Sequence, residues 1–354
     1  MTHYMMTLHT VSMRRTISLL IFLCFVNFCF PLCAQERSTP RRGEGISTFL
    51  ERHHRSGMSY QKAFIELNRR KLGKDETLRL GVVYTLPPLR EKRKTDVHNE
   101  APMPKHRPKN SIVNEPLFGK ALAQVKPTSS RLRNACFYVV SGHGGPDPGA
   151  IGQVGNKELH EDEYAYDIAL RLARNLMSEG AEVRIIIQDA KDGIRDELYL
   201  SNSKRETCMG DVIPLNQVKR LQQRCDKINA LYRTDRKRYN YCRAIFIHVD
   251  SRSKKQQTDV FFYHATQKAD SKRLANTMKS TFESKYGKHQ PNRGFSGTVS
   301  GRNLFVLAQT SPTSVFVELG NIQNTFDQQR FMMSSNRQAL AKWLTEGFVK
   351  DAGL

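Results

Sequence analysis

The sequence contains no hydrophobic run long enough for a comfortable membrane span, and it has far fewer acidic than basic residues. Its longest apolar stretch, Thr16–Phe30, falls short of the about 20 residues that a membrane helix needs. Asp and Glu number 34 against 56 Lys and Arg, for a net charge of +22. No RNA- or DNA-binding motif appears, and the basic residues are interspersed with acidic ones. This charge suits nucleic acid, an anionic lipid surface or an anionic wall polymer, and does not by itself select among them.

Residues 1–34 have the pattern of a secretory signal peptide. Arg14 and Arg15 precede the apolar stretch, and Ala34 ends a segment that resembles a cleavage site. An uncleaved anchor is the alternative, which the shortness of the stretch disfavours. We therefore predict an exported protein of the periplasm or cell envelope, with no stable membrane span after cleavage. Removing the two arginines from the +22 leaves +20 on the rest of the chain.

Cysteine is scarce after the predicted cleavage site, and it never has the spacing of a metal site. The four cysteines that remain there are Cys136, Cys208, Cys225 and Cys242. An exported chain can form disulfides, but four cysteines allow three pairings and the sequence selects none of them. Cys136 and Cys242 each precede a predicted strand, so a bridge between them and a pair of buried free thiols both stay open.

Three regions follow the predicted signal peptide. Residues 43–89 contain two short helical patterns and the strand pattern Leu78–Pro87, which together predict a small α+β module. Residues 90–134 include a stretch rich in Lys, Arg, His and Pro and poor in apolar side chains, so we predict a basic linker. Residues 135–352 form the third region, the large domain.

Strand and helix patterns alternate through the large domain. The predicted strands are Phe137–Ser141, Glu182–Gln188, a run ending at His248, Thr258–His264, Asn303–Ala308 and Ser314–Glu318. The predicted helices are Glu161–Ser178, Ile213–Tyr232, Ala269–Tyr286 and Asp327–Phe348. This alternation predicts an α/β fold, a mostly parallel twisted sheet with helices on both faces. The polar stretch Asp189–Asp211 interrupts it, either as a lid over the site or as an inert insertion.

Four residues with metal or acid–base chemistry stand at the ends of predicted elements. His143 follows the strand Phe137–Ser141 in a loop rich in Gly and Pro, and Glu161 opens a helix. His248 and Glu318 each end an apolar run. Ligands of open α/β sheets bind at the carboxyl ends of strands. Taken singly, each residue is better explained as a surface His or as a Glu that serves a helix start or an ion pair. Together they match a His₂Glu zinc site with a separate catalytic carboxylate.

The motifs around these residues resemble a known family. Gly142-His-Gly-Gly-x-Asp-x-Gly-Ala150, the helix-opening Glu161, Ile247-His248 and Val317-Glu-Leu-Gly320 are similar to the zinc-dependent N-acetylmuramoyl-L-alanine amidases of the amidase-3 type. The resemblance spans about Ala135–Gly347 and implies a phosphorylase/hydrolase-like fold. It implies one Zn²⁺ per chain on His143, Glu161 and His248, with Glu318 as general base. The implied substrate is peptidoglycan, cut between N-acetylmuramic acid and L-alanine, and an activator protein is an implied partner.

Several assignments within this pattern have rivals. Glu158 and Glu163 compete with Glu161 as the third ligand, and Glu163 and Asp250 are the alternatives to Glu318 as the base. The chain departs from the family after the second His, where it has Val249-Asp250, and after Val317-Glu-Leu-Gly320, where it has Asn321. These departures spare the ligands and concern the substrate pocket. The substrate-binding candidates are Asp147, Arg293, Arg302 and Asn324.

The module at residues 43–89 resembles a degenerate LysM domain, which implies binding to glycans that contain N-acetylglucosamine. The alternative is a docking subdomain without glycan affinity. Two other functions are weighed for the whole chain: a catalytically silent wall-binding or regulatory protein, and a nucleic-acid-binding protein. The intact set of four site residues argues against the first, and the predicted signal peptide argues against the second. We therefore expect no nucleic-acid partner.

Overall fold

The computed structural model describes residues 36–41, 44–55, 58–73, 77–89 and 111–353. They belong to two compact units that divide between residues 101 and 102. The predicted signal peptide, residues 1–34, and the first part of the predicted linker, residues 90–110, lie outside the described residues. Among the described residues, no helix combines the length and apolar character that crossing a membrane requires.

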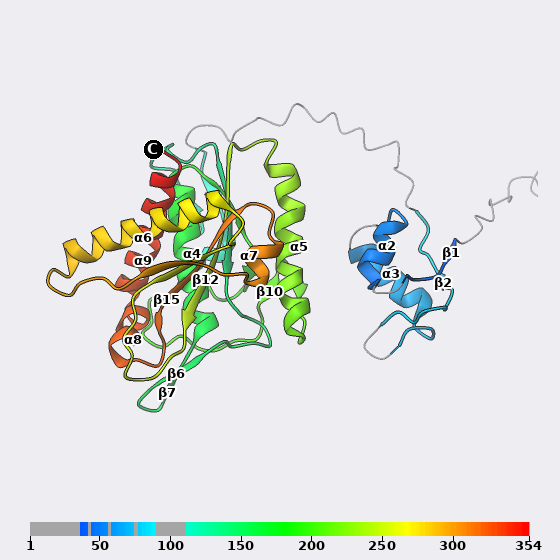
Figure 1. Ribbon diagram of the computed structural model, residues 1–354, viewed down its shortest axis with the longest axis horizontal. Helices are drawn as coiled ribbons and strands as arrows, with labels where there is room; N and C mark the ends of the chain where they lie inside the picture. Colours follow the sequence, from blue (N-terminus) through cyan, green and yellow to red (C-terminus); the bar gives the residue numbers. More distant parts are fainter. Residues whose placement is uncertain (1–35, 42–43, 56–57, 74–76, 90–110, 354) are drawn as a thin grey trace, which may run out of the picture. The chain divides into compact units, whose positions relative to one another are not determined.

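The N-terminal unit has the element order β–α–α–β (Figure 1). Strand β1 (Arg37–Ser38) pairs antiparallel with β2 (Tyr84–Thr85), and α2 (Ile46–Arg52) and α3 (Met58–Asn68) lie between them in the sequence. The core of this unit consists of Phe49, Leu50, Phe64, Leu72, Tyr84 and Leu86. The buried Asn68 side chain joins α3 to β2, because it accepts from the Thr85 N–H at 2.9 Å and donates to the Thr85 carbonyl at 2.8 Å. The unit thus begins before residue 43, and its second strand is shorter than predicted.

Residues 111–134 belong to the C-terminal unit, so this part of the predicted linker is wrong. Strands β3 (Val113–Asn114) and β4 (Gln124–Val125) pair antiparallel around the 3₁₀ turn η2 (Pro116–Phe118). Phe118, Val125 and Leu132 are each 1% exposed and lie in the main core of the unit. Burial of these three apolar side chains anchors the segment to the core.

A six-stranded mixed sheet forms the centre of the C-terminal unit, with strand order β14-β13-β15-β12-β5-β8. The strands are β5 (Ala135–Ser141), β8 (Glu182–Ile185), β12 (Tyr241–Asp250), β13 (Phe261–His264), β14 (Thr298–Gly301) and β15 (Thr313–Asn321). Strands β8, β5, β12 and β15 run parallel, whereas β13 is antiparallel to β15 and parallel to β14. The prediction of a mostly parallel sheet is confirmed.

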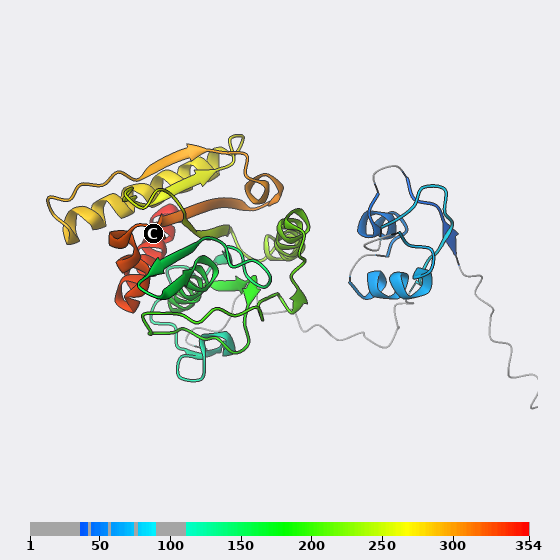
Figure 2. The same ribbon diagram turned by 90° about the horizontal axis from the view of Figure 1, so that it is seen from below.

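Helices cover both faces of the sheet (Figures 1 and 2). Alternate strand residues face opposite sides, so Val139, Ile245 and Val317 pack on one face and Val140, Phe246 and Phe316 on the other. The first face carries α4 (Glu161–Ser178), α6 (Ala269–His289), α8 (Thr325–Met332) and α9 (Ser334–Asp351). The second face carries α5 (Gln217–Asp235) and α7 (Phe305–Gln309).

Several predicted elements differ from the structure. The predicted strand Glu182–Gln188 ends at Ile185, and its last two residues join a separate sheet. The predicted strand Thr258–His264 begins at Phe261. The apolar run Asn303–Ala308 contains a short helix, α7, rather than a strand, because a run of this length does not distinguish the two. The helix predicted from Ile213 starts at Gln217, where the Asn216 side chain accepts from the Lys219 N–H at 3.0 Å and caps it. The single helix Asp327–Phe348 is two helices, because Met333 between them is extended.

Two small antiparallel sheets lie around the carboxyl ends of the parallel strands, and of their strands the sequence predicted only residues 187–188, as the end of the strand Glu182–Gln188. Strands β6 (Ile151–Val154) and β7 (Lys157–His160) form a hairpin directly before α4. Strands β9 (Ile187–Gln188), β10 (Thr207–Cys208) and β11 (Asp211–Val212) form a second antiparallel sheet at the two ends of the Asp189–Asp211 segment.

The four described cysteines are all buried and free. Cys136 and Cys242 are aligned on the neighbouring strands β5 and β12, so the expected proximity is present without a bridge. Of the two alternatives left open by the sequence, the structure has the free thiols.

Candidate active site

The three predicted metal ligands converge at the carboxyl ends of β5 and β12. His143 lies two residues beyond β5, His248 lies near the end of β12, and Glu161 is the first residue of α4. The His143 Nε2 lies 3.2 Å from the Glu161 Oε1, and the His248 Nδ1 lies 2.9 Å from the same oxygen. The two imidazole rings are edge-on, with centroids 4.9 Å apart. Three side chains from distant segments thus direct two nitrogens and one oxygen at one point.

These donor atoms suit a metal ion. All three lie within 4.8 Å of one another. Zinc bonds of about 2.0–2.2 Å in a tetrahedron place neighbouring donors roughly 3.3 Å apart, close to the separations found here. The donor set of two imidazoles and one carboxylate is also a combination that zinc accepts while retaining an open position. The triad therefore fits a metal ion of this class.

Glycine is required at two positions of the loop around His143, because the side chains of the triad occupy the space beside the backbone there. A Cβ atom at Gly142 would lie 2.4 Å from the His248 ring, and one at Gly149 would lie 2.7 Å from the Glu161 Oε2. His143 itself has a φ of 56°, in the left-handed region that non-glycine residues rarely adopt. Backbone strain of this kind is found where a side chain must be aimed.

Electrostatics favours a positive charge at the triad. Burial lowers the pKa of His143, but hydrogen bonds to Asp147 and Glu161 outweigh it and raise the pKa to about 10. Burial opposes ionisation of Glu161, yet hydrogen bonds from His143 and His248 hold its pKa well below the usual range. The Glu161 carboxylate also accepts from the N–H groups of Val249 at 3.0 Å and Ala150 at 2.8 Å. Glu161 is thus kept ionised, as a metal ligand must be.

Asp147 supports His143, a role that differs from the predicted contact with substrate. Its Oδ2 lies 3.0 Å from the His143 Nδ1 and accepts from the Arg220 Nη2 at 2.6 Å. A carboxylate that holds the far nitrogen of a ligating imidazole fixes its tautomer and orientation. Arg224, four residues after Arg220 on the same face of α5, donates to the His143 carbonyl. The i, i+4 spacing of the two arginines was the available sequence signal for this support.

The other substrate-binding candidates have structural partners. Arg293 pairs with Asp259 at 2.6 Å and lies over the Tyr286 ring. Arg302 lies over the Tyr263 ring, and its N–H donates to the His264 carbonyl. Asn324 caps α8, because its side chain accepts from Phe326 N–H and Asp327 N–H. Of the four residues predicted to contact substrate, the structure brings only Asp147 to the triad.

Glu318 lies beside the triad on β15. The register of the parallel strands aligns Glu318 with His248, so the two side chains share a face of the sheet. The Glu318 Oε2 is buried and has no hydrogen-bond partner among the described residues. Burial, followed by the charges of Glu161 and Asp250, raises the pKa of Glu318 well above its usual value. A buried carboxylate oxygen without a partner is unusual in a folded protein and indicates a missing ligand or a catalytic role.

The rival acids face elsewhere. Glu158 is on the β6–β7 hairpin and contacts His160 at 3.0 Å. Glu163 accepts from Arg195 at 2.8 Å and from the Ser203 N–H at 2.5 Å. Asp250 pairs with Arg252 at 2.5 Å. The partners of Glu158 and Glu163 favour Glu161 as the third member of the triad, and the partners of Glu163 and Asp250 favour Glu318 as the candidate base.

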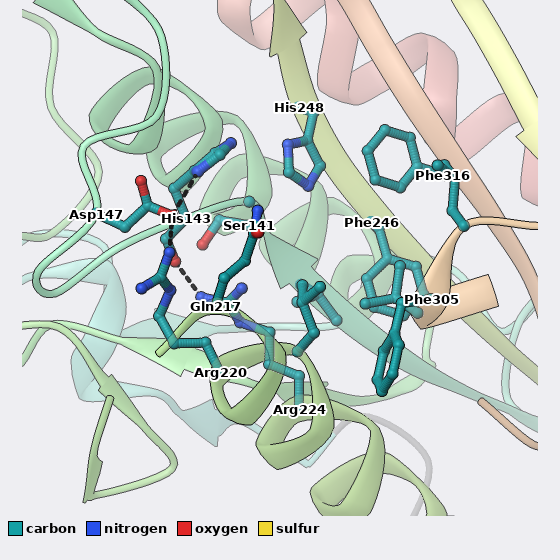
Figure 3. Close-up of a pocket in the computed structure, with 15 residues that line it drawn as sticks. Ser141, His143, Asp147, Gln217, Arg220, Arg224, Phe246, His248, Phe305 and Phe316 are labelled. Atoms are coloured by element: carbon teal, nitrogen blue, oxygen red, sulfur yellow. Dashed lines mark hydrogen bonds and ion pairs between the residues drawn. The ribbon is translucent and has the colours of Figure 1, made fainter. Parts of the chain in front are cut away.

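A pocket of about 150 Å³ adjoins the triad on the α5 and α7 face of the sheet (Figure 3). His143 and His248 line one side, and Gln217, Arg220 and Arg224 come from α5. The aromatic rings of Phe246, Phe305 and Phe316 complete the wall, and Phe316 stacks on His248 with centroids 4.3 Å apart. The pocket thus combines a guanidinium side with an aromatic side next to the triad. The sequence did not identify the three phenylalanines as lining residues, because residues that line a pocket carry no pattern of their own.

The chain is similar to known proteins in sequence and in fold. Residues 138–350 match the Amidase_3 family, described as N-acetylmuramoyl-L-alanine amidase. No curated protein matches the chain. Similar solved structures include an N-acetylmuramoyl-L-alanine amidase from Clostridium difficile 630 (20% identity, TM-score 0.43, 61% of this chain and 95% of that chain covered). The amidase AmiC2 of Nostoc punctiforme is 19% identical, with a TM-score of 0.43 and coverage of 63% of this chain and 97% of that chain.

A third similar structure is the CwlD amidase from Clostridioides difficile, which was solved in complex with the GerS lipoprotein. It is 18% identical, with a TM-score of 0.45 and coverage of 62% of this chain and 98% of that chain. The family match extends from β5, which leads to His143, through the strand that carries Glu318 to the last helix. This chain belongs to the Amidase_3 family of N-acetylmuramoyl-L-alanine amidases, and peptidoglycan is its substrate.

Proposed function

We propose that this amidase is zinc-dependent, with His143, Glu161 and His248 as the metal ligands and Glu318 as the general base. The observation that carries the proposal is the convergence of two imidazole nitrogens and one carboxylate oxygen within 4.8 Å. When bound, a zinc ion polarises the scissile carbonyl and makes water acidic enough to react near neutral pH. The bond cleaved is the amide between the lactyl group of N-acetylmuramic acid and the nitrogen of L-alanine.

Glu318 handles the proton in this proposal. It removes a proton from the water that attacks the lactyl carbonyl and returns it to the L-alanine nitrogen as the C–N bond breaks. Its unpartnered Oε2 leaves an acceptor free for this purpose. The raised pKa of Glu318 moves this group toward the operating pH, where one residue can both accept and donate a proton.

The adjoining pocket is proposed to orient the substrate through Arg220, Arg224 and its three phenylalanines. The stem peptide carries carboxylates, which guanidinium groups bind well, and the sugar and lactyl groups present apolar surface to the aromatic rings. Arg224 is 4% exposed and donates to the His143 carbonyl, so it couples the pocket to the metal ligand.

The central experiment is digestion of purified peptidoglycan followed by mass analysis of the products. The proposal expects free stem peptides that begin with L-alanine, with the glycan strand left intact. Purified protein should contain about one zinc per chain, and removal of zinc by a chelator should abolish activity until zinc is restored. Full activity without metal would contradict the zinc assignment. Normal zinc content without any peptide release would instead favour the catalytically silent wall-binding protein.

The N-terminal unit is proposed to bind glycan as a LysM-like module. Its β–α–α–β order and compact aromatic core support a folded module rather than a linker. Deleting residues 36–89 should weaken retention on insoluble peptidoglycan and leave turnover of soluble fragments nearly unchanged. Equal retention of the truncated and full-length proteins would reduce the unit to a structural appendage.

Export to the cell envelope and control by an activator protein complete the proposal. Export rests on the signal-peptide pattern of residues 1–34, and the amino terminus of the secreted protein, determined by mass spectrometry, would test it. The CwlD complex supports a protein partner for a family member. Recovery of a partner that raises turnover after cross-linking in the native envelope would support this part of the proposal.

A further inference from the structure

A second group of acidic side chains is buried next to the triad. Asp162 and Glu163 directly follow Glu161 in the first turn of α4, and Glu206 comes from the end of the Asp189–Asp211 segment. Their exposed fractions are 3%, 1% and 6%. One carboxylate oxygen from each residue lies within 4.8 Å of an oxygen from each of the others. Three carboxylates this close and this buried repel one another unless positive charge or protons compensate them.

Asp162 is the member without compensation. Its Oδ1 accepts only from the N–H of the adjacent Glu163, at 3.0 Å. Its Oδ2 is buried and has no hydrogen-bond partner in the described part of the chain. Leaving a carboxylate oxygen buried and unpaired is costly, so this atom marks a position where a ligand is missing.

The hydroxyl of Ser203 has too few protons for the two carboxylate oxygens that it contacts. Its oxygen lies 2.9 Å from the Asp189 Oδ2 and 2.5 Å from the Glu206 Oε1. A hydroxyl has one proton and can donate to only one of these acceptors. The other contact therefore brings two oxygens together without a hydrogen between them, unless a proton or a cation is added.

The arginines nearby neutralise only part of the charge. Arg195 pairs with Glu163 at 2.8 Å, and Arg205 pairs with Asp189 at 3.2 Å. Both arginines also contact the partly exposed Asp192, at 3.1 Å and 2.8 Å. When ionised, Asp162, Glu163, Asp189 and Glu206 carry four negative charges against two positive ones, and Asp192, which shares the same two arginines, raises the negative total to five. This excess of two to three negative charges attracts a divalent cation.

We propose that Asp162, Glu163 and Glu206 bind a hard divalent cation, calcium, at a site separate from the triad. All donors are oxygens, which calcium and magnesium prefer and which do not favour zinc. Two oxygens on opposite sides of one calcium ion are about 5 Å apart, since each bond is about 2.3–2.6 Å long, whereas magnesium requires about 2.0–2.1 Å and strict octahedral geometry. Separations within 4.8 Å admit both ions, and the burial of all three carboxylates favours calcium, because magnesium loses its waters reluctantly and usually keeps several of them.

The site would fasten the Asp189–Asp211 segment to the active-site helix. Glu206 is the only one of the three ligands that the segment supplies, and its Oε2 accepts from the Gly145 N–H at 2.7 Å in the His143 loop. A cation shared by Glu206 and the first turn of α4 links that loop, that helix and the segment. Its expected effect is on the order and stability of this region, and the inference does not depend on the zinc chemistry.

Calcium titration of purified zinc-loaded protein tests the inference, with zinc content followed in parallel. Calorimetry should detect one calcium per chain. At a calcium concentration 100-fold above the dissociation constant, the melting temperature should rise by about 5–10 °C. Magnesium should give a smaller rise. Calcium should also slow tryptic cleavage after Lys191, Arg195, Lys204 and Arg205, which all lie in the segment.

Asp162→Asn and Glu206→Gln should remove calcium binding, the thermal shift and the tryptic protection. Glu283→Gln is the matched control, because this residue is half exposed and pairs only with Lys279 on α6. Asp162→Asn also removes the uncompensated charge, so we expect it to fold and to melt no lower than the calcium-free wild type. The wild-type titration alone decides the matter if a variant fails to fold.

Two results would overturn the inference. The first is a wild-type protein whose melting and proteolysis do not respond to calcium, or respond equally in the Asp162→Asn variant. The second is a calcium-insensitive protein that becomes more stable between pH 8 and pH 6, because protons would then provide the compensation in place of a cation.

Discussion

The first turn of α4 contributes to two clusters of charged side chains with different chemistry. Glu161 joins His143 and His248, whose rings line the pocket in Figure 3. Asp162 and Glu163 join Glu206 in a cluster that is almost fully buried. The first cluster has two nitrogens and one carboxylate, which suit zinc, and the second has only oxygens, which suit calcium.

Helix geometry separates the two clusters. Successive side chains on an α-helix point in directions that differ by about 100°, so three consecutive acids cannot all bind the same ion. Glu161 faces the strand ends, whereas Asp162 and Glu163 face the Asp189–Asp211 segment. In that segment the Ser203 N–H and the Arg195 guanidinium donate hydrogen bonds to Glu163. Residues that the sequence presents as rivals for one role therefore take different roles.

The strongest test of this separation is His143→Ala, which removes a triad ligand. We expect zinc to be lost and turnover to disappear, beyond the about 10–100-fold cost of losing an outer-shell partner. His264→Ala is the matched control. Strand β13 is antiparallel to β15, so its last residue, His264, lies away from the strand ends that carry the triad. Zinc content by elemental analysis should fall only in the first variant. Equal loss of zinc in both variants would show general unfolding rather than loss of a ligand.

The Glu318→Gln substitution should separate metal binding from proton transfer. It preserves the shape of the side chain and removes the base, so zinc content should stay normal while kcat falls by about 10²–10⁴-fold. Asp250→Asn is the control for charge near the site, since Asp250 already pairs with Arg252, and it should retain most of the turnover. If Glu318→Gln empties the metal site, Glu318 is a ligand and the role of Glu161 is wrong.

Asp147→Asn should have an intermediate effect. It weakens the contact with the His143 Nδ1, so zinc affinity should fall by about 10–100-fold. Excess zinc should restore much of the turnover, because the substitution acts through metal binding rather than through substrate. A variant with unchanged zinc affinity and a raised KM would return Asp147 to the substrate-binding role that the sequence suggested.

The smallest effect is expected at the cysteines, which contribute to neither cluster. Burial raises the pKa of Cys208 and of Cys242 to about 11. Because a raised pKa reduces the thiolate fraction below that pKa, labelling at pH 8 should be on the order of 10²-fold slower than for a free thiol with a pKa of about 8.5. Zinc removal should not change these rates. Rapid labelling, or a disulfide found by mass analysis of the non-reduced protein, would contradict the buried free thiols.

The sequence alone determined the α/β fold of the large domain and the positions of its four candidate site residues. Apolar runs that end at His248 and Glu318, or shortly before His143, mark parallel strands, and parallel strands bring their carboxyl ends together. The local pattern was insufficient where an apolar run is short. The prediction of a strand at Asn303–Ala308 was therefore wrong, and this run contains a helix. The local pattern also failed for residues 111–134, where a few buried apolar side chains anchor a segment that is basic in composition.

Only the tertiary structure decided which polar side chains meet. Asp147 bonds to His143, and Arg293 and Asn324 serve a salt bridge and a helix cap, although all three are equally plausible substrate contacts in the sequence. The meeting of Asp162 and Glu163 with Glu206 likewise has no local pattern. Such contacts depend on how a long irregular segment packs against a helix, and packing is decided by burial and hydrogen bonding across the whole fold rather than by the spacing of residues along the chain.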